Sequence, residues 1–237
     1  MIDAKKLIDQ YLGAGTLDSL SAQGRDYSAR AQDTVRQNPL ASGALAGGVA
    51  ALLLGTKSGR KLGKNAIKYG GLAVVAGLAY KAYRDHQAGQ RPPIDPGSAG
   101  EPELIAAPAD TPFVPDAAHE NERALALLVA MIQASKADGY IDADEQTRIF
   151  EKLDSVELDA EAKAFVLEEM RKPMDVDRVV SMADTPEVAM ELYAASLVAI
   201  DPDHPAEKGY LEMLAARLGL DPGLVEHLNT TVAAARI

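Results

Sequence analysis

ASKADGYIDADE, residues 134–145, joins an apolar helical pattern to a second helix through a turn that carries acids and a glycine. From Asp138 onward the stretch matches the second half of an EF-hand calcium loop: an oxygen ligand, the turn glycine Gly139, an apolar residue, and a glutamate placed to ligate from the next helix. The first half is missing, because the two earlier ligand positions hold Ala134 and Lys136. An ammonium group at a ligand position repels a cation, so the stretch is not a standard EF-hand.

The same residues also have a purely structural interpretation. Gly139 can end one helix, and Asp142 or Asp144 can cap the next, since carboxylates near the first turn of a helix are stabilised by its dipole. Under that alternative the acids stabilise helix ends and bind no metal.

A second acidic turn follows a related apolar run. Residues 127–138, LLVAMIQASKAD, align with residues 190–201, MELYAASLVAID, and each run ends in an aspartate followed by a turn and a glutamate. The second turn contains Asp201, Asp203, His204 and Glu207. A repeated helix–turn–helix unit predicts that the two turns lie close together, with enough oxygens for Ca²⁺ or Mg²⁺ and with His204 as a donor for a softer metal.

Composition favours an all-α protein of one or two domains. The chain has 237 residues, no cysteine, no tryptophan and three phenylalanines, with abundant alanine and leucine that suit helix packing through small residues. The absence of cysteine excludes disulfides, thiolate metal sites and cysteine nucleophiles. The net charge of −11 disfavours nucleic acid as a partner of the whole chain.

The amino-terminal part predicts a membrane-associated segment. Residues 1–36 form a polar leader with one short apolar stripe, and residues 37–85 hold two uncharged runs, 37–56 and 69–80. The first run is just long enough to cross a hydrocarbon core of about 30 Å, and the second is shorter, so we predict a glycine-rich helical hairpin in the membrane. Small residues recur every four positions and provide a face for close helix packing or for homo-oligomers: Gly43, Gly47, Ala51 and Gly55.

Basic residues surround the second uncharged run and predict membrane lipid as a partner. Acids are absent from residues 37–84, whereas lysine and arginine lie between the two runs and again at Lys81 and Arg84. Residues 86–116 then hold seven of the chain's 13 prolines. We predict that they form an extended, semi-rigid linker between the membrane segment and a folded domain at residues 117–237.

That folded domain has the pattern of seven helices. Proline, glycine and capping residues predict helices near 117–137, 142–155, 160–172, 175–182, 185–200, 204–219 and 222–235. Apolar residues recur at helical spacing at Leu125, Leu128, Val129 and Ile132, and less regularly from Leu192 to Ile200. We expect these side chains to form the core.

Three segments, in this order, carry a resemblance to a known family: the glycine-rich run with its basic residues, ASKADGYIDADE, and AIDPDHPAEKGYL. Together they resemble the bacterial inner-membrane YebE family, whose carboxy-terminal domain is similar to the tellurite-resistance TerB-like fold. The resemblance implies an inner-membrane location and a TerB-like bundle in which two acidic turns bind a divalent cation. The residues it implies as metal ligands are Asp138, Asp142, Glu145, Asp201, Asp203 and Glu207. Pro202 departs from the doubled Asp-Gly pattern of that fold.

These observations favour a non-enzymatic, membrane-anchored sensor or scaffold linked to envelope or metal stress of the tellurite type, with Ca²⁺ or Mg²⁺ preferred over Zn²⁺. A metal-dependent hydrolase is the first alternative. It would use the acidic turns and His204, with Lys136 and Lys208 as the nearest cations in sequence. The second alternative is a purely structural helical interaction domain whose acids are helix caps.

Overall fold

Helices account for all the regular secondary structure in the part of the chain that the structure describes. The computed structural model describes residues 71–90, 105–116, 118–139, 160–200, 202 and 204–235. Its helices are α5 (Gly71–Gln87), α6 (Glu120–Ala134), α8 (Ala160–Arg171), α9 (Val176–Val180), α10 (Pro186–Ala199), α11 (Pro205–Arg217) and α12 (Pro222–Ala235). The predicted all-α class is confirmed for these residues.

Helix boundaries follow the capping residues that the sequence displays. Thr185 accepts a hydrogen bond from the backbone N–H of Val188 at the start of α10. Asp221 accepts hydrogen bonds from Gly223 and Leu224 at the start of α12. As a result, six helices predicted between residues 117 and 237 occur within a few residues of their expected limits. The helix predicted near 142–155 lies outside the described residues.

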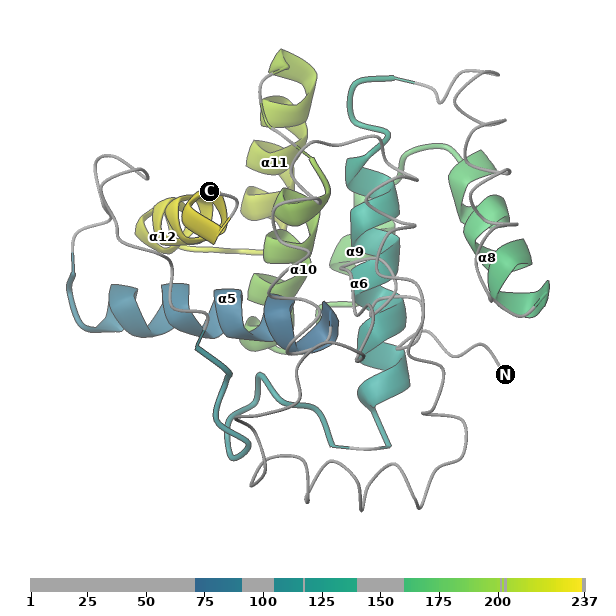
Figure 1. Cartoon of the computed structure of the whole chain (residues 1–237). Coiled ribbons are helices and arrows are strands. Elements are labelled where there is room, and N and C mark those ends of the chain that lie inside the picture. Colours follow the sequence, from purple (N-terminus) through teal and green to yellow (C-terminus); the bar gives the residue numbers. More distant parts are fainter. Residues whose placement is uncertain are drawn as a thin grey trace, which may run out of the picture.

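α10 is the helix around which the others pack. Every residue from Val188 to Ala199 is buried, so this helix has no solvent-facing side over that stretch. It contacts α5, α6, α11 and α12, and its contact with α6 is the most extensive between any two described helices. Figure 1 shows α10 in the middle, with α6 alongside it, α5 passing across its lower part and α12 to its left.

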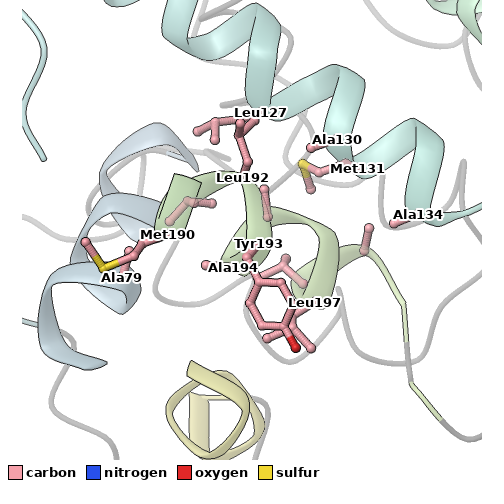
Figure 2. Close-up of a cluster of buried hydrophobic side chains, with 14 of the residues drawn as sticks. Ala79, Leu127, Ala130, Met131, Ala134, Met190, Leu192, Tyr193, Ala194 and Leu197 are labelled. Carbon is pink, nitrogen blue, oxygen red and sulfur yellow. The ribbon is translucent and has the colours of Figure 1, made fainter. Parts of the chain in front are cut away.

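α6 and α10 run in the same direction. The side chain of Arg123 meets Glu191 near the start of both helices, and the Ser196 hydroxyl lies 3.5 Å from the carbonyl oxygen of Ala130 one to two turns later. Later residues of α6 therefore contact later residues of α10. In Figure 2 the chain runs the same way from Leu127 to Ala134 as it does from Met190 to Leu197. The two apolar runs aligned in the sequence are thus paired helices with parallel axes.

The described part of the second uncharged run shows no membrane hairpin. Residues 71–80 lie in α5, which packs against α12 and α10. Most apolar side chains of these residues are buried in the core: Leu72, Val74, Val75, Ala76, Leu78 and Ala79. Among the described residues no helix has both the length and the apolar character needed to cross a membrane. An alanine-rich helix that is buried by protein on most sides has the same composition as one buried by lipid, which explains the difference.

The two basic residues at the end of α5 pair with an acid of the same helix. Lys81 Nζ lies 2.5 Å from Asp85 Oδ2, and Arg84 Nη2 lies 2.9 Å from Asp85 Oδ1. These cations were expected to face lipid head groups, whereas their nearest anion is the Asp85 carboxylate, one residue beyond the stretch that lacks acids. The two ion pairs hold the pKa of Asp85 below its usual value even though burial acts in the opposite direction.

The described end of the proline-rich segment is folded onto α5. Phe113 is buried, and its ring meets Tyr80 edge to face with 5.6 Å between the centroids. Backbone hydrogen bonds make turns here, from Thr111 to Pro108 and from Val114 to Thr111. This part therefore differs from the extended spacer predicted for residues 86–116. The predicted leader 1–36, the run 37–56 with Gly43, Gly47, Ala51 and Gly55, and residues 91–104 lie outside the described residues.

The packing of α5 predicts that a fragment starting at residue 117 will not fold cooperatively. Such a fragment lacks α5, and so exposes the faces of α10 and α12 that α5 covers. Burial of each large apolar side chain is worth about 1.5–3 kcal/mol, so the loss approaches the whole stability of a typical domain. We expect a sharp thermal transition for a fragment 66–237 and none for 117–237. Equal melting of the two fragments would show that α5 is dispensable.

Candidate functional site

The first acidic turn begins directly at the end of α6. Residues 135–139 form the turn, the backbone N–H of Gly139 donates to the carbonyl of Lys136, and Asp138 is exposed. Gly139 has φ +147°, a conformation that side chains rarely adopt, so the glycine is required by the backbone here. The other two predicted ligands of this turn, Asp142 and Glu145, lie outside the described residues.

Lys136 points away from the acidic turn. Its ammonium group donates to the carbonyl oxygens of Glu169 at 2.8 Å and Lys172 at 3.0 Å, at the end of α8. The side chain is buried, and this burial lowers the pKa of Lys136 despite the nearby Glu169 carboxylate. Charge at a helix carboxyl end compensates the dipole and the free carbonyls. Lys136 is the cation that argued against an EF-hand in the sequence. In the structure its hydrogen bonds connect the turn after α6 to the end of α8.

A buried polar network fixes the point where the first turn leaves α6. Glu169 is fully buried and accepts hydrogen bonds from Lys172 at 2.6 Å and Arg178 at 2.8 Å. Gln133, also fully buried, accepts from the backbone N–H of Asp175 at 2.8 Å. Buried polar groups need such partners, and together they connect α6, α8 and α9 at one end of the fold.

The second acidic turn leads into α11. His204 is the N-cap, and its Nδ1 accepts a hydrogen bond from the backbone N–H of Ala206 at 3.2 Å. Glu207 accepts from the backbone N–H of His204 at 3.3 Å, which completes a capping box. Glu207 therefore has the capping role that the structural alternative gives to the acids, and His204, which that alternative did not name as a cap, is the N-cap. Asp201 and Asp203 lie outside the described residues.

The parallel arrangement places both turns after the same ends of two paired helices. The negative ends of the α6 and α10 dipoles consequently lie on one side of the fold. Neither helix has a basic residue in its last turn, in contrast to α8 and α11, which end with Arg171 and Arg217. The last turns of α6 and α10 therefore lack the basic side chain that compensates the helix dipole in α8 and α11.

Most of the predicted metal centre lies outside the residues that the structure describes. Within the described ranges no three histidine, aspartate or glutamate side chains come close enough together to hold a metal ion. Of the six predicted ligands, only Asp138 and Glu207 fall within those ranges.

Glu191 is a buried charge that the sequence analysis missed. Its side chain is fully buried in α10, and its Oε2 lies 2.5 Å from Arg123 Nη1 on α6. Burial raises the pKa of Glu191 to about 7, with smaller contributions in the same direction from Glu187 and Asp184, while Arg123 acts against them. The signal available in the sequence was a single acid inside the apolar run MELYAASLVAI, which needs a partner when every side of the helix is buried.

We expect Glu191 to make stability fall as pH rises. Its folded pKa is above that of the unfolded chain, so its contribution is complete below pH 4.5 and is lost as pH approaches 7. The loss is about 3 kcal/mol at most, at about 1.4 kcal/mol per pKa unit. The amide of Glu191→Gln resembles the protonated carboxyl and does not titrate, so urea unfolding between pH 4.5 and 8 should show wild type losing up to about 3 kcal/mol relative to this variant as pH rises. Glu226→Gln, an exposed change on α12, should follow wild type. Parallel curves for wild type and Glu191→Gln would contradict the assignment.

Comparison with known proteins gives one family and one relative. The sequence profile of a family described as "Protein of unknown function (DUF533)" matches residues 39–232. A protein of Yersinia enterocolitica, described as "Uncharacterized protein in ampR 5'region", is 28% identical over 98 residues, which are 41% of this chain and 70% of that protein. No solved structure matches the chain significantly.

Proposed function

The chain belongs to the DUF533 family, which is a TerB-like family of proteins of unknown function, and we propose that it acts as a non-enzymatic scaffold whose acidic turns bind a divalent cation. The observation that carries the proposal is the parallel pairing of α6 and α10. This pairing brings the carboxyl ends of both helices to one side of the fold, where the negative ends of their dipoles favour positive charge.

The chemistry of the turns favours a hard cation. The turns contain carboxylates and backbone carbonyls. Such oxygen ligands are typical of Ca²⁺ and Mg²⁺ sites rather than of Zn²⁺ sites. Lys136 no longer counts against binding, because its ammonium group is held by the carbonyls of α8. In this proposal Asp138 ligates from the first turn, and Asp201 with Asp203 from the second.

A scaffold fits the surroundings of the turns better than a hydrolase does. Phosphate or peptide hydrolysis needs cations that orient the substrate beside the metal. Of the two lysines near the turns in sequence, Lys136 is buried and bonded within the fold, and Lys208 lies on α11. The Nδ1 atom of His204 is likewise occupied by its capping hydrogen bond.

The membrane anchor and the stress role complete the proposal. They are supported by the uncharged run 37–56, with its small-residue stripe, and by the resemblance to inner-membrane proteins of tellurite-type stress. In this arrangement cation binding changes the relation between α6 and α10 in a domain held at the bacterial inner membrane.

Thermal melting of the full-length protein tests cation binding. A cation that binds only the folded chain, at a hundred times its dissociation constant, should add about 2.7 kcal/mol and raise the melting temperature by several degrees. We expect this shift with Ca²⁺ or Mg²⁺ relative to chelator, and its loss in Asp138→Ala combined with Asp201→Ala. Asp110→Ala, which removes an exposed acid far from both turns in sequence, should keep the shift.

The structural alternative gives a different result in the same experiment. If the acids act only as caps, Asp138→Ala costs about 1 kcal/mol in chelator and in every cation alike. A melting temperature that no cation changes would therefore reject the cation proposal.

A further inference from the structure

A pocket of about 420 Å³ lies between α10, α11 and α12, and neither of the two predicted cation ligands that the structure describes lines it. Its apolar lining is aliphatic: Leu197, Leu211, Val225, Val232 and Ala233. Pockets of this volume take small organic molecules, and an aliphatic lining suits an alkyl chain.

A hydrogen-bonded pair forms the polar part of the wall. The side chain of Tyr193 is almost fully buried, and its hydroxyl donates to Asn229 Oδ1 at 3.1 Å. Burial raises the pKa of Tyr193 to about 12, so the hydroxyl keeps its proton at any physiological pH. Because the oxygen of the Asn229 amide is used in this way, its NH₂ group remains as a donor at the exposed edge of the pocket.

Two opposite charges stand on the rim. Lys208 and Glu212 both line the pocket, are both exposed, and lie four residues apart on α11, which places them on one face of that helix. The rim therefore has no net charge. A head group with a single charge is attracted by one of these side chains and repelled by the other. A head group that carries both charges can be attracted by both Lys208 and Glu212.

We propose that this pocket binds a single-chain zwitterionic amphiphile, taken up as one molecule. Its alkyl chain lies between α10, α11 and α12. Its anionic group, a phosphate or carboxylate, accepts from Lys208 and the Asn229 amide, and its ammonium group faces Glu212. The proposal does not depend on a bound cation, and its test is carried out in chelator.

Head-group selectivity tests the proposal directly. Full-length protein in an amphipol, so that no detergent competes, is titrated by calorimetry with four probes of equal chain length: octylphosphocholine, octanoate, octylammonium and octyl glucoside. We expect saturable one-to-one binding of octylphosphocholine, and binding weaker by about tenfold for the other three, as a lost or reversed head-group charge predicts.

Three variants in the pocket and one control outside it make the assignment specific to this pocket. Glu212→Lys should weaken octylphosphocholine about tenfold and turn the preference toward octanoate, and Lys208→Glu should turn it toward octylammonium. Glu226→Lys makes the same charge change on an exposed site of α12 outside the pocket, and should leave the preference of the wild type. Ala233→Phe fills the aliphatic floor and should weaken all four probes.

Each of the contrary results overturns the proposal. These are an absence of octylphosphocholine binding, equal binding of all four probes by the wild type, an unchanged preference in Glu212→Lys, or full binding by Ala233→Phe. Because the rim residues are exposed, their variants keep the fold, and melting curves verify this for each protein. A failure here leaves the cation proposal intact, since that proposal is tested by different residues and a different ligand.

Discussion

The burial of α10 on every side is the constraint on which the described fold depends. A helix that is apolar around its whole circumference cannot lie on a surface, so it must be enclosed by other elements. α5, α6, α11 and α12 supply that enclosure, and most of the side chains they bury are small or aliphatic. The charged exception within α10 is Glu191, which is tolerated because Arg123 reaches it from α6.

The same constraint explains why α5 was assigned to a membrane from its sequence. An apolar run rich in alanine and glycine satisfies lipid and a protein core equally well, and composition does not distinguish the two. The distinguishing information lay just beyond the run, where Asp85 pairs with Lys81 and Arg84 and Phe113 packs on Tyr80. A sequence window that ends before these residues contains only the apolar part of the helix.

Local signals and long-range contacts differ in how far they could be predicted. The starts of α10 and α12 were predictable, because Thr185-Pro186 and Asp221-Pro222 act on backbone groups within three residues. The parallel pairing of α6 and α10 was not, since it depends on contacts between residues more than sixty positions apart. The role of Lys136 was misjudged for the same reason: a ligand position is defined by local spacing, but the carbonyls that hold the ammonium belong to α8.

The two proposed sites meet at the segment between α10 and α11. Pro202 lines the amphiphile pocket, and it lies between Asp201 and Asp203, two of the predicted cation ligands. Proline fixes its own φ and restricts the residue before it, so a ligand that contacts Pro202 contacts a constrained position of the backbone. If both proposals hold, this ligand binds one residue along the chain from two ligands of the cation. By linkage, each ligand would then change the affinity for the other by the same factor, and the junction of α10 and α11 would be the element through which they communicate.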